Sequence, residues 1–503
     1  MPPSDRTQSG APALGDQIHE WSALSQAAAV RSGQVSPVEL VDHYLDRIAA
    51  SDHALGAFTT VTADAAREEA RAAERRVRDG DEHLPPLFGV PTAVKDLVGT
   101  AGVTSSFGSR AFQDFVPALD AHSVALLRAA GTISLGKTST PEFGLSAYTD
   151  SDVARSARTP WDLDRSAGGS SGGAAAAVAA GLVPFAHGSD GGGSLRIPAS
   201  ACGVFGLKPS RGRVSSGPLG VDVTGLSVQG PIARTVRDAA AMLDALAVPM
   251  TGDPYWAQPL PAGETFLGWT RRDPGRMRIA RYTDPGATDL ALAPECRDAY
   301  EDATALLLSL GHEVEEIPNP AGSESAEPFF IAWAVQSLSW PVPPEREQLL
   351  RPLTRWWREL GRAASAEQFL GALSALQLLA RRVLTATQDY DAVLTPTLAM
   401  PPQPPQWFFG DGDPADRRGP DFEAELARQT AFTPYTGICN VTGQPAASLP
   451  LWWTADGLPV GVALAGRPAG EARLLSLCAQ IEAARPWADR RPSPIAAAHN
   501  EEI

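Results

Sequence analysis

The sequence predicts an α/β protein in which helices cover both faces of a β-sheet and a smaller α/β unit is inserted. Short strand-like segments alternate with helical segments through the first half of the chain, a pattern typical of this class. Residues 278–317 repeat the pattern as strand, helix and strand, which indicates a βαβ insertion at the edge of the main sheet. The 503 residues, 44% hydrophobic and 20% charged, suit a soluble globular protein with more than one domain.

The helix predicted at 36–50 has clear boundary signals. Ser36 can cap it, Pro37 suits the first helical position, and Glu39 completes a capping box. Apolar residues then recur at helical spacing along one face. Further helices are expected at 62–79, 121–130, 172–181 and 293–310.

Strands are predicted where short apolar runs follow turn signals. A turn and a buried strand are expected within 89–98, and a further apolar stretch lies at 182–186. The other expected strands are 132–135, 278–282, 312–317, 391–395, 446–450 and 459–465.

These elements suggest five segments along the chain. They are a flexible N-terminal tail (1–15), a core with N-terminal helices (16–265), an inserted small α/β and helical region (266–375), the C-terminal part of the core (376–490) and a flexible tail (491–503).

Composition narrows the possible partners and compartment. The formal net charge of −16 argues against nucleic acid or an anionic membrane as a partner. Four cysteines without CxxC spacing indicate buried thiols in a reducing compartment. The apolar run 174–186 is too short to span a bilayer, and no signal peptide is visible. We therefore expect a cytoplasmic protein.

Three motifs carry the chemistry: GVPTAVKDL (89–97), SAGGSSGG (166–173) and GSDGGGSLRIP (188–198). A serine hydroxyl is a weak nucleophile until a base activates it. Lys95 follows an apolar stretch, and burial would lower its pKa and leave a neutral amine. Ser170 and Ser194 are both set among glycines, whose backbones can approach other groups closely. The N–H groups of Gly191, Gly192 and Gly193 can converge on one point, as in an oxyanion hole.

Together these motifs resemble those of the amidase signature family of Ser-cisSer-Lys amidohydrolases. The resemblance extends over GKTSTPEFG, the block from SAGGSSGG through GLKPSRGRVS, YDAVLTPT and NVTGQPAASLP. It implies a large mixed sheet and a catalytic triad of Lys95 as base, Ser170 on a cis peptide bond, and Ser194 as nucleophile. It also implies that the amides of Gly191, Gly192 and Gly193 form the oxyanion hole, with that of Ser194 assisting.

The resemblance implies an amidase that works through an acyl-enzyme, without a metal or another cofactor. Its partners would be a small-molecule amide and, as a family-level expectation, a second copy in a homodimer. This chain departs from the family pattern at Ser139 and Thr159, where Asn is common, and at Gly191, where Thr is usual. None of the three belongs to the triad, so the departures bear on loop support and substrate fit.

The substrate is predicted to be a small uncharged amide. In overall character the chain is most similar to enzymes that act on linear or cyclic amide oligomers of the nylon type and on aryl acylamides. Aromatic residues are concentrated in 329–357 and 407–409 and could line an apolar pocket, or simply pack in the core. The residues expected to contact substrate are Ser171, Phe143, Leu145 and Trp333.

Some motifs also match other functional classes. GTISLGKT (131–138) matches a P-loop pattern, but its middle is strand-like. GGSSG (168–172) matches the elbow of a Ser-His esterase of α/β-hydrolase type, which would need His187, His312 or His499. The eight histidines show no metal-binding spacing. A glutamine-hydrolysing subunit of a tRNA amidotransferase shares the family and would require a partner protein. A non-enzymatic scaffold would be expected to lack one of the triad residues, and all three are present.

Overall fold

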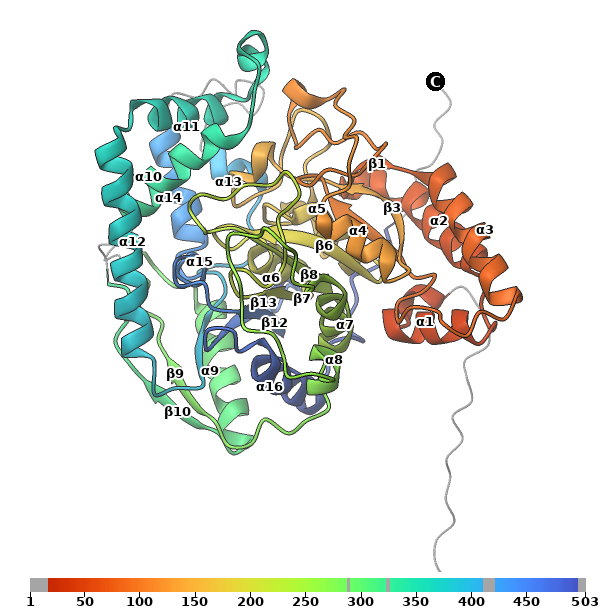
Figure 1. Cartoon of the computed structure of the whole chain (residues 1–503). Helices are drawn as coiled ribbons and strands as arrows, with labels where there is room; N and C mark the ends of the chain where they lie inside the picture. Colours follow the sequence, from red (N-terminus) through yellow and green to blue (C-terminus); the bar gives the residue numbers. More distant parts are fainter. Residues whose placement is uncertain (1–16, 287–289, 323–325, 410–420, 496–503) are drawn as a thin grey trace, which may run out of the picture.

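The computed structural model describes residues 17–286, 290–322, 326–409 and 421–495. The predicted tail 1–15 and the part of the predicted tail 491–503 beyond residue 495 lie outside this range. An eleven-stranded mixed sheet runs through the centre of the molecule, with helices on both sides (Figure 1). This confirms the predicted α/β class.

The strands of the large sheet occur in the order β1-β3-β2-β6-β8-β7-β12-β13-β11-β9-β10. Their bounds are β1 Phe58–Val61, β2 Pro91–Lys95, β3 Ile133–Thr138, β6 Phe185–Asp190, β7 Phe205–Lys208, β8 Val228–Ala233, β9 Arg278–Arg281, β10 Glu313–Glu316, β11 Ala392–Pro396, β12 Ala446–Trp453 and β13 Pro459–Gly466. A separate hairpin is formed by β4 Arg158–Thr159 and β5 Asp162–Ser166.

The helices agree with the sequence-based expectations. The helix predicted to start near residue 36 begins at the expected cap, where the capping box of Ser36 and Glu39 is formed. The helical bounds are α1 Ala23–Arg31, α2 Pro37–Leu55, α3 Ala63–Arg78, α4 His122–Ala129, α5 Gly172–Ala179, α6 Arg196–Cys202, α7 Val236–Leu246, α8 Phe266–Trp269, α9 Pro294–Ser309, α10 Ala326–Gln336, α11 Pro352–Ala363, α12 Ala366–Ala386, α13 Pro405–Phe409, α14 Phe422–Phe432, α15 Ile438–Thr442 and α16 Glu471–Ala484.

Two hydrophobic clusters fill the two faces of the sheet. One includes Phe185 and Ala233 with side chains from α7, α9 and α16, and the other includes Ala186 and Ile232 with side chains from α2, α3 and α5. Neighbouring residues of one strand enter opposite clusters because side chains alternate across a sheet. Both faces are therefore buried.

The catalytic motifs meet because β2 and β6 are parallel neighbours in the sheet. The carboxyl ends of parallel strands lie at the same edge. Lys95 is the last residue of β2, and Asp190 is the last residue of β6. The sheet thus brings together two motifs that are far apart in the sequence.

The predicted insertion adds strands and a helical layer. β9 and β10 pair in parallel and extend the edge of the same sheet through β11. Helices α10, α11 and α12 stand together on one side of the molecule, at the left of Figure 1. By length and composition alone α12 could span a membrane, but its buried residues Ala372, Leu376, Leu379 and Val383 follow helical spacing, as in an amphipathic helix packed on a core.

Candidate active site

Lys95 and Ser170 are in direct contact. The Nζ atom of Lys95 lies 2.7 Å from Oγ of Ser170, at hydrogen-bond distance, and both side chains are buried. The peptide bond between Gly169 and Ser170 is cis. A Cβ on Gly169 would lie 2.6 Å from the backbone of Tyr148, so no larger residue fits there. The contact between Lys95 and Ser170 is therefore made inside a closely packed loop.

Burial favours the neutral amine of Lys95. Its side chain is completely buried, and desolvation lowers the pKa well below the usual 10.5, although the charge of Asp190 opposes this shift. Nζ also lies 3.0 Å from Oγ of Ser189 and 3.4 Å from its carbonyl oxygen. Sequence reasoning did not single out Ser189, although it stands in the GSDGGGS motif, five residues before the predicted nucleophile.

Ser194 lies in the turn between β6 and α6. Its carbonyl oxygen accepts a hydrogen bond from the amide of Ser171 at 3.2 Å, which joins the loops of the two predicted catalytic serines. The residue is 6% exposed and borders a cavity. The structure thus brings Lys95, Ser170 and the loop of Ser194 into one region.

The loop that carries Ser194 is built around the carboxylate of Asp190. This carboxylate accepts hydrogen bonds from the amides of Gly193 at 2.7 Å and Leu195 at 3.1 Å, and it pairs with both ends of the Arg196 guanidinium at 2.9 and 3.0 Å. Burial tends to raise the pKa of Asp190, but Arg196 outweighs it, and the pKa falls to about 2. Asp190 is therefore ionised at neutral pH.

A second segment, remote in sequence, holds the same loop. Asn440 donates to the carboxylate of Asp190 at 2.9 Å and accepts from Arg196 at 2.8 Å. The hydroxyl of Thr436 donates to the carbonyl of Gly192 at 2.6 Å. Asn440 is in the NVTGQPAASLP motif, but nothing in the sequence alone showed what it contacts.

The predicted oxyanion hole requires a correction at Gly193. Its N–H donates to Asp190 and is thus taken up inside the loop. Gly193 also has φ of 138°, and a Cβ there would lie 2.2 Å from Oγ1 of Thr436. This glycine is required by the loop conformation, whereas Gly192 borders the cavity.

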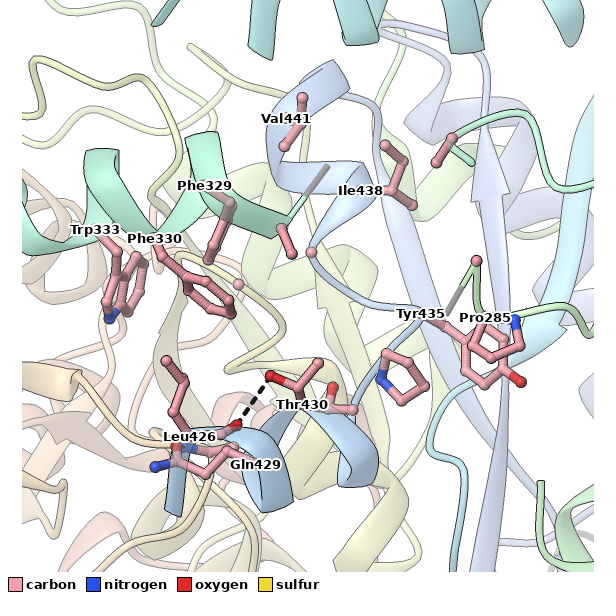
Figure 2. A pocket seen from close by; sticks show the side chains of 18 of the residues that line it. Pro285, Phe329, Phe330, Trp333, Leu426, Gln429, Thr430, Tyr435, Ile438 and Val441 are labelled. Atoms are coloured by element: carbon pink, nitrogen blue, oxygen red, sulfur yellow. Dashed lines mark hydrogen bonds between the residues drawn. The ribbon is translucent and has the colours of Figure 1, made fainter. Parts of the chain in front are cut away.

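The cavity next to Ser194 has a volume of about 220 Å³. Figure 2 shows Trp333, Phe330 and Leu426 toward one end and Tyr435 and Pro285 toward the other. None of the described residues that line it carries a charge. The cavity is suited to an uncharged, largely apolar molecule.

The predicted contact residues divide into two pairs. Leu145 and Trp333 line the cavity. Phe143 instead packs in a neighbouring aromatic cluster, stacked on Trp340 with ring centroids 4.9 Å apart. The hydroxyl of Ser171 lies away from the cavity lining and donates to the carbonyl of Ser189 at 3.0 Å. The structure therefore places neither Phe143 nor Ser171 in the lining of this cavity, and substrate contact by either residue stays a prediction.

The two aromatic segments also differ. From 329–357, the cavity is lined by Phe329, Phe330, Trp333 and Trp357. The segment 407–409 packs against Tyr148 and Phe432 in a separate cluster and does not line the cavity. Only the first segment forms part of the site.

The alternative motifs have structural roles. Within 131–138, residues 133–138 form strand β3, which leaves no phosphate-binding loop, and Lys137 is buried 3.6 Å from Asp96. His187 bonds to Gln229 at 2.7 Å and His312 to Gln480 at 2.8 Å. The other ring nitrogen of His312 accepts from the Met277 amide and that of His187 has no partner within the described part of the chain, so neither ring is hydrogen-bonded to a serine there. His499 lies outside the described residues. Among the described residues, no group of three or more His, Cys, Asp or Glu side chains could hold a metal ion.

Comparison with known proteins shows which chains this one is similar to. A family model described as Amidase matches residues 39–475. The chain is 42% identical over 475 residues to "Putative amidase AmiB2" of Mycobacterium tuberculosis, covering 94% of this chain and 97% of that protein. It is similar to the solved structure of 6-aminohexanoate cyclic dimer hydrolase complexed with substrate, with a TM-score of 0.85, 32% identity and coverage of 95% and 100% of the two chains. A bacterial aryl acylamidase structure gives a TM-score of 0.80 at 30% identity, with 94% and 97% covered.

We predict that Arg196→Met strongly destabilises the protein. Removing the guanidinium would leave the buried charge of Asp190 unpaired, which typically costs about 3–5 kcal/mol. The free energy of unfolding in urea measures the effect. Arg276→Met is the matched control because the Arg276 side chain is 71% exposed in its ion pair with Glu313, and we expect a change below about 1 kcal/mol. Equal effects of the two substitutions would contradict the role given to Arg196.

Proposed function

Because the chain belongs to the amidase family, we propose that it hydrolyses the carbon–nitrogen bond of a small uncharged amide through a serine acyl-enzyme. One observation carries this proposal: the fully buried amine of Lys95 lies 2.7 Å from Ser170, in the loop bonded to that of Ser194. A buried amine with a lowered pKa can take a proton, and the adjacent serine can pass one on.

In the proposed reaction, Lys95 takes the hydroxyl proton of Ser170 as Ser170 takes that of Ser194. The Oγ atom of Ser194 then bonds to the amide carbonyl carbon, and the negative charge on the carbonyl oxygen is stabilised by backbone amides. Gly191, Gly192 and Ser194 supply these donors in our proposal, since Gly193 donates to Asp190. Lys95 returns the proton through Ser170 to the departing nitrogen as the carbon–nitrogen bond breaks. Water then attacks the acyl-enzyme by the same relay and releases the acid.

The uncharged cavity supports an uncharged substrate. A charged group moved from water into this site would lose hydration and find no charged side chain of opposite sign among the described residues of the lining. This disfavours free glutamine, which carries two charges, and with it the amidotransferase alternative. The 6-aminohexanoate cyclic dimer named for one structural neighbour and the aryl acylamides named for another are both consistent with such a cavity.

We further propose that the enzyme works in the cytoplasm. All four cysteines are buried free thiols, which is consistent with a reducing compartment. A small-molecule substrate needs no nucleic acid or membrane partner. The homodimer stays a prediction, which light scattering of the purified protein can check.

We predict that Ser194→Ala abolishes amide hydrolysis while the protein stays folded. The substitution removes only the nucleophilic oxygen. Released amine would be measured on a panel containing an anilide, an aliphatic amide, a cyclic amide dimer and glutamine. We expect the three uncharged substrates to be turned over faster than glutamine.

Ser25→Ala is the control for this serine replacement, because Ser25 is exposed on α1 and far from the catalytic loops in the sequence. It should keep full activity. Turnover that survives in Ser194→Ala would show that another residue is the nucleophile. Turnover restricted to glutamine would favour the amidotransferase subunit instead.

Activity should depend on pH through Lys95. The relay needs the neutral amine, so kcat/KM should fall about tenfold per pH unit below the pKa of Lys95 and level off above it. Because burial lowers this pKa well below 10.5, the plateau should begin well below pH 10.5. A profile of kcat/KM against pH measures this. An acidic limb centred at or above pH 10.5 would contradict a buried, neutral Lys95.

A further inference from the structure

Two aromatic side chains of α10 lie directly over the glycines next to the nucleophile. A Cβ built on Gly191 would lie 3.1 Å from both Cη2 and Cζ3 of Trp333, and one on Gly192 would lie 3.3 Å from Cζ of Phe329. The two rings are stacked, with centroids 5.6 Å apart and planes inclined by 17°. The proposed oxyanion loop thus packs against a flat aromatic surface.

The backbone itself does not require glycine at position 191. Among the glycines of this loop, only Gly193 has a positive φ, so an L-residue could adopt the conformation of Gly191. What a side chain at 191 would meet is the Trp333 indole and, also at 3.1 Å, the hydroxyl of Ser227. The indole therefore gives a physical reason for a glycine at the position where the resembling family usually has threonine.

Trp333 also forms part of the wall of the cavity. It belongs to one hydrophobic cluster with Phe330, Trp357 and Leu145. Helices α10 and α11 approach so closely that a Cβ on Gly361 would lie 2.4 Å from the carbonyl oxygen of Ala334. The indole is thus packed among neighbouring apolar side chains, and it also borders the loop and the cavity. The Trp333 side chain can therefore contact both a substrate group in the cavity and the backbone of the loop.

We propose that Trp333, together with Phe329, is a positioning and specificity-determining residue. It keeps the backbone of Gly191 and Gly192 in place, and it selects amides with a planar aryl group that lies along the aromatic wall. This inference rests on the proposed amidase function and deepens it by naming the substrate class. Planar rings prefer offset-stacked or edge-to-face contacts with other rings, which an alkyl chain cannot reproduce.

A double-mutant cycle tests the contact between residues 191 and 333. Gly191→Thr should lower kcat at least tenfold in the presence of Trp333, because the added atoms push the indole and the loop apart. In the Trp333→Ala background the same change should lower kcat less than threefold, because only the contact with the Ser227 hydroxyl then remains, and that side chain can rotate. Gly191→Ala is the milder version if the threonine variant folds poorly. Multiplicative, independent effects of the two changes would overturn the proposal.

The matched control for adding a side chain to a glycine is Gly371→Ala. Gly371 lies on α12, and no atom lies within 4 Å of its added Cβ. This variant should show unchanged kcat and KM. A comparable loss of activity would mean that the effect at Gly191 is not specific to Trp333.

Specificity is tested with a pair of amides that differ only in a phenyl or a hexyl group. Trp333→Ala should lower kcat/KM for the phenyl amide at least tenfold more than for the hexyl amide. A purely structural role of Trp333 would lower both equally, and that result would overturn the specificity part of the proposal.

The same double-mutant cycle can be measured as thermal stability, without any activity. Failure of the proposed function can then be distinguished from failure of the inference about Trp333. Gly191→Thr should lower the melting temperature clearly more in the Trp333 background than in the Trp333→Ala background, where only the contact with the Ser227 hydroxyl remains. If the wild type hydrolyses no amide, the proposed function fails while this stability cycle still decides the contact. If the wild type is active and both cycles show independent effects, only the inference about Trp333 fails.

Discussion

The removal of the Lys95 amine from water is the condition on which the site depends. An exposed lysine carries a proton at neutral pH and cannot accept another. Here the last residue of a central strand is buried beneath the loops of the two serines, and desolvation lowers its pKa. Parallel pairing of β2 with β6 places these groups at one edge of the sheet. The sheet order, rather than any single motif, therefore makes the base possible.

Asp190 limits how far burial lowers the pKa of Lys95. Its negative charge raises the pKa of Lys95, against the effect of burial, yet its carboxylate also organises the nucleophile loop. Arg196 neutralises much of this charge, because its Nε and Nη2 atoms bind the two oxygens of the carboxylate. The paired charge acts more weakly on Lys95 than an isolated carboxylate would, while the carboxylate keeps its hydrogen bonds to the loop amides. A buried ion pair thus serves the geometry of the loop and moderates the electrostatics of the base.

Local sequence signals predicted the secondary-structure elements and the buried position of Lys95 better than the lining of the cavity. The capping box at Ser36 and the burial of Lys95 follow from nearby residues, which is why they could be predicted. The orientation of Phe143 depends on Trp340, almost 200 positions away, and the contacts of Asn440 depend on a loop 250 positions away. The Gly193 amide was misassigned because glycine spacing shows that an N–H is accessible, not which acceptor it meets. Such contacts are determined by tertiary packing.

Chemistry and selectivity come from different parts of the chain. The base and both serines lie on β2, on the loop before α5 and on the turn after β6, whereas the aromatic wall comes from α10 and α11, which lie between β10 and β11 in the sequence. Changes in those helices could reshape the cavity without moving Lys95 or Ser170. The separation is incomplete at one place, where Trp333 lies over Gly191. Because Trp333 packs against the loop that we propose stabilises the developing charge, we expect a change of this wall residue to alter both the selectivity and the rate.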